Sequence, residues 1–208
     1  MISDNMIYLD HAATTPIDAE VLNAMLPYFK DDFGNPSSIH LYGQKAEAAI
    51  DSSREIIAQL LNCHTNEIIF TSGGTESNNL AIRGVALAAK KHRKANHILI
   101  SPVEHPAITN TAKQLAYLYD YEIEFLPVDQ YGVVDPKNVA SRLRSDTAIV
   151  SVIYANNEVG SINPISEIGA ICQERGVPFH TDAVQATAFL PIDVQSLNID
   201  FHRQFHMF

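Results

Sequence analysis

The chain alternates short apolar runs with longer segments in which apolar residues recur at helical spacing. The apolar runs predict strands at Glu67–Ser72, His97–Pro102, Tyr121–Val128, Thr147–Ala155, Val177–Asp182 and Asn198–Phe201. The helical spacing predicts helices at Ile17–Phe29, Gln44–Leu61, Glu76–Lys91, Ala107–Tyr119, Pro136–Leu143 and Ile165–Arg175, the last ended by Gly176.

The predicted strands are nearly continuous apolar runs, such as TAIVSVIYA at Thr147–Ala155. This pattern favours a mostly parallel sheet whose two faces are both covered by helices. Strands that alternate with helices predict right-handed crossovers and an open, doubly wound α/β fold. We expect an N-terminal arm at 1–15 and one large domain at 16–201, with ligands beyond the carboxyl ends of the strands.

Charge and composition limit the kinds of partner and the cellular location that we expect for this protein. Fourteen basic and 24 acidic residues give a formal net charge of −10, which disfavours nucleic acid or an anionic membrane as partner. No apolar run reaches the ~20 residues of a membrane span, and the first residues lack the features of a signal peptide. Two distant cysteines predict neither a disulfide framework nor a metal site. We therefore expect a cytoplasmic protein.

The stretch TSGGTES predicts a turn between a strand and a helix that begins at Thr75 or Glu76. Gly73 and Gly74 allow the backbone to approach a ligand closely. The amides at the start of the helix, together with the Thr75 hydroxyl, form an anion site of the kind that binds phosphate. A glycine-rich turn that Thr75 simply caps explains the same residues, so this stretch alone leaves both interpretations open.

Two further stretches follow predicted strands. In SPVEHPAI, His105 lies between a predicted strand and a predicted helix. Its imidazole either stacks on an aromatic cofactor or transfers protons, or it simply caps the helix that Pro106 begins. In YANNEVG, Asn156 and Asn157 either turn the chain or donate side-chain hydrogen bonds to a ligand oxygen. Neither stretch by itself decides between its two interpretations.

The stretch FHTDAVQA ends an apolar strand with Asp182 and places Gln185 three residues later. A carboxylate among apolar neighbours needs a cationic partner, unless it caps a helix. One such cation is the protonated pyridine nitrogen of pyridoxal 5′-phosphate (PLP), which a carboxylate keeps protonated. The four stretches lie at the carboxyl ends of successive predicted strands, in an order that wraps one phosphorylated aromatic cofactor.

Six stretches between about Ile7 and Phe201 carry a family resemblance: IYLDHAATTP, FGNPSSIHLYG, EIIFTSGGTESNNLAI, VEHPAI, NNEVGSINPI and HTDAVQ. In this order and spacing they resemble the cysteine desulfurases of the NifS and IscS kind, in the class V aminotransferase superfamily. The resemblance implies the PLP-dependent transferase fold of aspartate aminotransferase, PLP as cofactor and a homodimer. It also implies removal of sulfur from L-cysteine, giving alanine and an enzyme persulfide for a sulfur-acceptor or scaffold protein of iron–sulfur cluster or thiolation pathways.

The resemblance implies a cofactor site made of six residues of this chain: Gly74, Thr75, His105, Asn157, Asp182 and Gln185. The first two would hold the phosphate, and the histidine, also the one catalytic residue implied, would stack on the ring and act in proton transfer. The asparagine would contact the hydroxyl side of the ring and the substrate. The aspartate would pair with the pyridinium nitrogen, and the glutamine would bond the phenolic oxygen.

The resemblance also implies residues that this chain does not supply. The family holds PLP as a Schiff base on a lysine in a pattern similar to S-x-S-x-H-K-x-x-G-P, and an alignment without gaps places Phe208 at that lysine. The nucleophilic cysteine and an arginine for the substrate belong to a C-terminal small domain, and Cys63 and Cys172 do not match that cysteine. We therefore expect an incomplete large domain, an aberrant tail at 202–208 and a chain that is inactive alone.

Two alternatives stay open. A selenocysteine lyase or another class V PLP enzyme shares these motifs, because the loop that separates such enzymes lies in the C-terminal domain. A non-catalytic remnant, which binds PLP or a subunit without chemistry, is the alternative from a different class. In each case an uncovered domain interface should expose apolar surface and favour association.

Overall fold

The computed structural model describes residues 7–11, 13–187 and 189–203, the last three of them through their backbone alone. The chain divides into two compact units, one that ends at Ala58 and one that begins at Gln59. The predicted boundaries of arm, large domain and tail stay a prediction. Among the described residues, no helix has the length and apolarity needed to cross a membrane.

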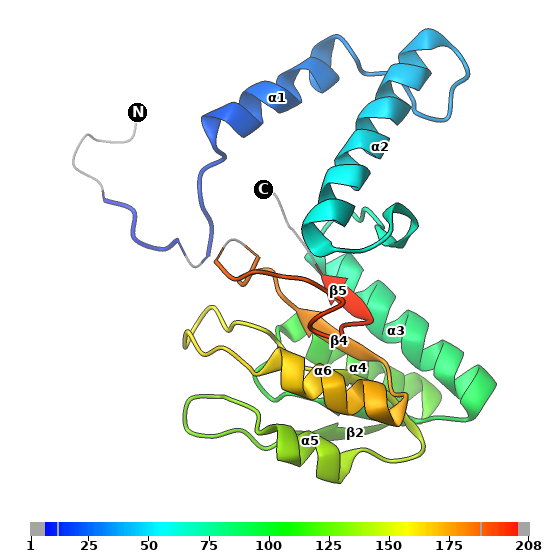
Figure 1. The fold of residues 1–208 in the computed structure, drawn as a ribbon, viewed down its shortest axis with the longest axis vertical. Coiled ribbons are helices and arrows are strands. Elements are labelled where there is room, and N and C mark those ends of the chain that lie inside the picture. The colour runs from blue at the N-terminus through cyan, green and yellow to red at the C-terminus, as the bar shows by residue number, and fades with distance from the viewer. Residues whose placement is uncertain (1–6, 12, 188, 204–208) are drawn as a thin grey trace. The chain divides into compact units, whose positions relative to one another are not determined.

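The first unit contains α1 (Ala19–Lys30) and most of α2 (Leu41–Leu61) (Figure 1). Helix α1 begins where the Asp18 carboxylate accepts a hydrogen bond from the Glu20 amide at 2.7 Å, which satisfies one of its unpaired donors. No residue of α1 is buried, although the helix is amphipathic and carries Leu22, Leu26 and Phe29. Within the first unit, this helix therefore leaves its apolar side chains unburied.

The second unit carries a five-stranded sheet in the order β2-β1-β3-β4-β5, in which all paired strands are parallel. Its strands are β1 (His97–Ile100), β2 (Glu122–Phe125), β3 (Thr147–Ser151), β4 (Phe179–Asp182) and β5 (Phe201–Arg203). Its helical segments after α2 are the 3₁₀ turn η1 (Thr65–Glu67), α3 (Gly74–Arg93), α4 (Pro106–Tyr119), α5 (Pro136–Arg142) and α6 (Ile165–Arg175).

Helices cover both faces of this sheet. Along β1, Ile98 and Ile100 join a buried cluster with residues of α3 and α4, whereas Leu99 joins a second cluster with residues of α5 and α6 (Figure 1). Successive side chains of a strand point to opposite faces, so a strand buried on both sides is mostly apolar. The predicted α/β fold with a parallel sheet flanked by helices is confirmed.

The predicted strand at Glu67–Ser72 is wrong. Glu67 ends the turn η1, and the residues that follow it belong to none of the strands described. Ile69 and Phe70 are 69% and 49% exposed. An apolar run forms a strand only when a neighbouring strand pairs with its backbone, and no described strand pairs with this segment.

The last predicted strand is displaced. Residues Asn198–Phe201 were expected to form it, but the strand β5 begins at Phe201 and pairs with β4, with Arg203 opposite Asp182. The backbone of residues 202 and 203 is therefore part of the sheet, although both were assigned to the tail. Residues 204–208, the remainder of the expected tail, lie outside the described part of the chain.

Candidate functional site

The predicted site residues follow the carboxyl ends of three parallel strands or begin α3. His105 comes after β1, Asn157 after β3, and Asp182 is the last residue of β4. Parallel strands end at the same edge of a sheet, so these loops share one edge. Gln185 follows Asp182 in a turn that the Ala186 amide closes onto the Ala183 carbonyl at 2.9 Å, and it is half-buried there.

Helix α3 begins without a side-chain cap. Its N-cap is Gly73, which has an extended conformation. The next residue, Gly74, is buried, and Thr75 is exposed. The Glu76 carboxylate turns back and accepts hydrogen bonds from the amide and hydroxyl of Ser72, at 2.7 and 2.6 Å, which lower its pKa. The first amides of an α-helix have no partner within the helix, so this start has the donors of an anion site.

His105 is the N-cap of α4. Its Nδ1 accepts a hydrogen bond from the Ala107 amide at 3.1 Å, and Pro106 occupies the first turn. Since Nδ1 acts as the acceptor, the proton of the neutral ring is on Nε2. The ring is exposed at the carboxyl end of β1. The helix-capping interpretation is therefore confirmed, and it leaves the far side of the ring for contacts with a ligand.

The two asparagines after β3 lie in different environments. Asn156 holds its loop, because its Oδ1 accepts hydrogen bonds from the amides of Glu158 and Val159 at 2.9 and 3.0 Å. Its Nδ2 donates to the Val103 carbonyl at 3.1 Å, which joins this loop to the one after β1. Asn157 is exposed beside it. The first asparagine therefore turns the chain, and the ligand contact expected of Asn157 stays a prediction.

Asp182 is buried at the end of β4, with only 4% of its surface exposed. Its Oδ2 accepts a hydrogen bond from Nδ2 of Asn78 at 3.0 Å, and its Oδ1 accepts one from the Val184 amide at 3.2 Å. Asn78 is buried on α3, one turn beyond Gly74. The helix that carries the anion site and the buried carboxylate are thus joined directly.

A second buried carboxyl lies near Asp182. Glu104 precedes His105, and its Oε1 accepts a hydrogen bond from the Ile153 amide at 2.6 Å. Burial raises the pKa of the Glu104 carboxyl well above its ordinary value, and the charge of Asp182 raises it further. Its Oε2 is buried and has no hydrogen-bond partner among the described residues. Burial and the charge of Asp182 favour the protonated, neutral form of Glu104, and they outweigh the hydrogen bond from the Ile153 amide, which favours the ionised form.

A cavity of about 690 Å³ lies elsewhere on α3, between Leu80, Ala81 and Val85 of that helix and Pro178 and Asp200. None of the six predicted site residues lines it. This cavity is mainly apolar, whereas the strand ends around Asp182 carry the charged and hydrogen-bonding groups. The predicted site residues therefore lie apart from this cavity, at the carboxyl edge of the sheet.

The sequence matches the family model of the class-V aminotransferases over residues 7–203. The chain belongs to the class-V aminotransferase family. This agrees with its parallel sheet and with the polar groups at the carboxyl ends of its strands. The fold and the family implied by the sequence motifs are both confirmed.

Named relatives in this family are cysteine desulfurases. The protein named cysteine desulfurase IscS of Dictyoglomus turgidum is 49% identical over 194 residues, covering 93% of this chain and 48% of the relative. The putative cysteine desulfurase IscS 1 of Bacillus subtilis is 50% identical over 194 residues, covering 93% of this chain and 50% of the relative. This chain therefore spans about half the length of the curated relatives it matches.

A solved structure of this family has a similar backbone. The structure of SspA in complex with cysteine has a TM-score of 0.89 and 38% sequence identity, and it covers 96% of this chain and 56% of SspA. The described class-V fold therefore extends over nearly the whole of this chain. That cysteine is bound in SspA is a fact about SspA, and it bears on this chain only as a proposal.

Two buried residues of this edge, Asn78 and Glu104, were not among the predicted site residues. Both lie inside the motifs TSGGTESNN and VEHPAI, beside residues whose types predict cofactor contacts. Asn78 meets Asp182 across 104 positions of sequence. The available signal was a polar residue one helical turn from Gly74 on a helix that packs against the sheet.

Proposed function

We propose that this chain is the PLP-binding part of a cysteine desulfurase, which removes sulfur from L-cysteine, and that it has no such activity alone. The observation that carries the proposal is the pairing of an uncapped α3 start with the buried Asp182, through Asn78, at the carboxyl edge of a class-V fold. Relatives named cysteine desulfurase, 49% and 50% identical, support the substrate class.

The residues at this edge fit the group that the family implies. A phosphate needs several donors in a small space, and the first amides of α3 with the Thr75 hydroxyl supply them. A pyridinium nitrogen needs a carboxylate shielded from water, and Asp182 is 4% exposed. The buried Oδ1 of Asn78 has no hydrogen-bond partner among the described residues, so this region also retains unused acceptor capacity.

Each side chain then has a separate task. When bound, PLP supplies an electron sink that stabilises negative charge on the substrate. Thr75 and the α3 amides bind and orient the phosphate, and Asp182 holds a proton on the ring nitrogen. His105 stacks on the ring and exchanges a proton through Nε2, because Nδ1 is held by the Ala107 amide. Asn157 and Gln185 bond the oxygen on the ring.

The lysines of the second unit support the expected lack of activity. Lys90 and Lys91 are in the last turn of α3 and Lys94 is its C-cap, so all three lie at the far end from Gly74. Lys113 is exposed within α4. Lys137 begins α5, which follows the edge strand β2, three strands away from β4. None of these amines is placed to attach the cofactor beside Asp182.

We further propose that the protein acts in the cytoplasm as a homodimer and transfers sulfur to an acceptor or scaffold protein. The amphipathic but unburied helix α1, with Leu22 44%, Leu26 51% and Phe29 74% exposed, supports association with a second copy. Iron–sulfur cluster assembly is the pathway we infer from the relatives named IscS.

Binding of two vitamers tests this proposal. Pyridoxamine 5′-phosphate carries the phosphate and the ring but cannot form a Schiff base, so its binding needs no lysine. We expect saturable binding of pyridoxamine 5′-phosphate by fluorescence, no covalent adduct with PLP after borohydride treatment, and no sulfide from L-cysteine. Absence of saturable binding to the folded chain contradicts the proposed site, and sulfide release by the chain alone contradicts the expected inactivity.

A further inference from the structure

Three polar residues are buried together where α3, β4 and the loop after β1 meet. Asn78, Glu104 and Asp182 are 0%, 7% and 4% exposed, although they come from three separate parts of the chain. Burying polar groups costs free energy unless their hydrogen bonds are satisfied. A cluster of this kind at the ligand edge of the sheet therefore needs an explanation beyond packing.

Asn78 connects the two ends of the proposed site. Its Nδ2 donates to Oδ2 of Asp182 at 3.0 Å, and it lies one helical turn after Gly74. The bond therefore fixes the carboxylate of β4 relative to the start of α3. A cofactor that is held by its phosphate at one end and by its ring nitrogen at the other requires this separation to be constant.

Glu104 supplies a second carboxyl to the same buried space. Two neighbouring carboxyls in a low-dielectric site do not both ionise, and the pair keeps one proton. Burial and the charge of Asp182 raise the pKa of the Glu104 carboxyl, which favours its protonated form. Its other oxygen accepts a hydrogen bond from the Ile153 amide, which fixes the carboxyl group in place.

We propose that Asn78 and Glu104 are positioning residues for Asp182, a role that rests on the proposed function. Asn78 sets the orientation of the Asp182 carboxylate toward the ring nitrogen. Glu104 carries the proton of the carboxyl pair, so that Asp182 stays charged without a second negative charge beside it. Neither residue touches the reacting atoms.

The test uses the full chain and pyridoxamine 5′-phosphate as probe. The absorbance of bound ligand is followed as pH rises, because the spectrum of the ring depends on whether its nitrogen is protonated. An opposite charge within about 4–6 Å shifts a pKa by about 1–3 units, so wild-type chain should keep the ring protonated at least about one pH unit above the free ligand. Among the described groups, Asn78 of α3 donates to Asp182, and Glu104 of the β1 loop feels its charge. Ser151 of β3 bonds His180 of β4 and also the Glu104 carboxyl, and Arg203 of β5 is paired with Asp182 through the backbone.

The first variants form a double-mutant cycle. Asn78→Ala should weaken binding roughly tenfold and lower the pH at which the ring loses its proton, since a hydrogen bond to a charged group is lost. Asp182→Asn should weaken binding more than Asn78→Ala does. The double variant should bind nearly as well as Asp182→Asn alone, because Asn78 acts through Asp182. Asn138→Ala, a surface asparagine bonded to Arg142, is the matched control.

Glu104→Gln tests the second residue, because glutamine resembles the protonated acid in shape and charge. The affinity of this variant for pyridoxamine 5′-phosphate should be within about twofold of wild type, and the bound ring should lose its proton at the same pH. If Glu104 were ionised in the wild type, the substitution would remove a negative charge and change both values. Melting curves by circular dichroism verify that each variant is folded. A stable Asn78→Ala chain with unchanged affinity and ring titration overturns the role of Asn78.

The outcomes separate this inference from the function on which it rests. If wild type binds the ligand but the losses of Asn78→Ala and Asp182→Asn simply multiply, Asn78 does not act through Asp182 and only this inference fails. If Glu104→Gln shifts the ring titration by about one unit or more, Glu104 is not the protonated member of the pair. If the folded wild-type chain does not bind the ligand, the proposed function fails together with the inference.

Discussion

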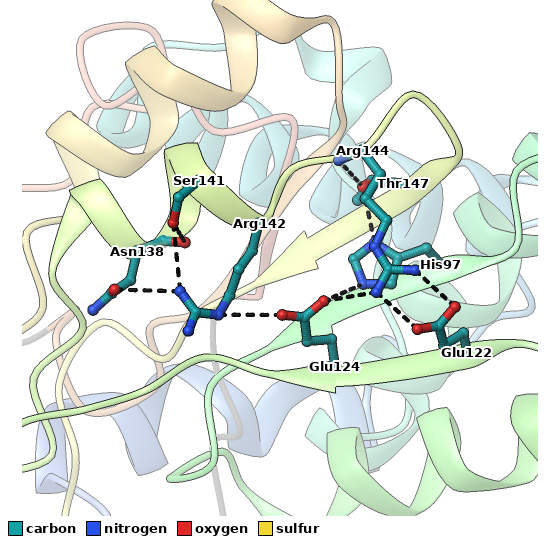
Figure 2. Close-up of polar contacts among 8 residues, drawn as sticks. All are labelled: His97, Glu122, Glu124, Asn138, Ser141, Arg142, Arg144 and Thr147. Carbon is teal, nitrogen blue, oxygen red and sulfur yellow. Dashed lines mark hydrogen bonds and ion pairs between the residues drawn. The ribbon is translucent and has the colours of Figure 1, made fainter.

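The carboxylates at the two ends of the sheet lie in different environments. At the amino ends of the strands, Glu122 and Glu124 of β2 meet the guanidinium groups of Arg142 and Arg144 (Figure 2). At the carboxyl ends, Glu104 accepts a hydrogen bond from the Ile153 amide, and Asp182 accepts hydrogen bonds from the Asn78 side chain and the Val184 amide. The carboxylates of the amino edge therefore lie in partly exposed ion pairs, whereas those of the carboxyl edge are buried.

At the amino edge, the acidic and basic side chains balance one another's charge. Arg144 binds both oxygens of Glu122 at 2.7 Å and reaches Glu124 at 2.9 Å, while Nε of Arg142 lies 3.2 Å from the other oxygen of Glu124. These bonds lower the pKa of Glu122. Two positive and two negative side chains are present, so the cluster needs no external ion.

The histidine of the amino edge lies between a hydroxyl and a carboxylate, with its Nε2 3.4 Å from Oε2 of Glu124. His97 is buried, and its Nδ1 lies 2.9 Å from Oγ1 of Thr147 (Figure 2). Burial lowers the pKa of His97, and nearby Arg144 lowers it further. The comparison teaches that charge alone does not mark a functional site. A buried carboxylate held by amides, at the ligand edge of the sheet, is the more informative arrangement.

The largest expected effect comes from removing the charge at the carboxyl edge. Asp182→Asn should weaken pyridoxamine 5′-phosphate binding by about tenfold to a hundredfold, since hydrogen bonds to charged groups contribute about 1.5–3 kcal/mol. Glu122→Gln removes a carboxylate from the amino edge and should leave the affinity unchanged. Fluorescence titration of both variants measures the contrast, and equal losses would abolish the distinction between the edges.

The next effect concerns the phosphate end of the proposed site. Thr75→Val removes a hydroxyl from the start of α3 and should weaken binding of pyridoxamine 5′-phosphate by about tenfold. Binding of pyridoxamine, which has no phosphate, should be unaffected by the same change. An equal loss for the two ligands would mean that Thr75 supports the fold rather than the phosphate.

A smaller effect should appear in stability as pH changes. The pKa of Glu104 is raised in the folded chain, so its contribution is fully present below its unfolded pKa and is lost as pH rises through the folded pKa. Glu104→Gln should therefore melt a few degrees above wild type at pH 8, with no such gain at pH 4.5. A melting difference that does not vary with pH would contradict a protonated Glu104.

The smallest effect is expected at the amino edge. Arg144→Gln removes an exposed cation from Glu122 and Glu124, and exposed ion pairs contribute little because water and salt screen them. The melting temperature should fall by at most a few degrees, and the difference between variant and wild type should become smaller in about 1 M salt. A large loss that salt does not alter would mean that this cluster stabilises the fold through packing.

Much of the fold follows from local pattern. The continuous apolar run TAIVSVIYA contains β3, and the helix predicted at Ile165–Arg175 agrees with α6, which Gly176 ends in a left-handed conformation at φ 63°. Such segments are decided by residues next to one another. The run at Glu67–Ser72 carries a similar local signal, but a strand also needs a partner, which no local pattern provides.

The candidate site was predictable only in part for the same reason. Each motif placed one polar residue at a strand end, and the sequence order placed them at one edge. The bond from Asn78 to Asp182 and the neutral state of Glu104 depend on burial and on contacts between distant segments. Asn156, by contrast, is explained by its own loop.

The protonation state of the bound ring tests the central claim most directly. Pyridoxamine 5′-phosphate labelled with ¹⁵N at the ring nitrogen gives a chemical shift that reports whether that nitrogen carries a proton. In complex with the wild-type chain at pH 8, we predict the shift of a protonated ring, and in complex with Asp182→Asn the shift of an unprotonated one. An unprotonated ring in the wild-type complex would contradict the assignment of Asp182 and of the carboxyl edge as the cofactor site.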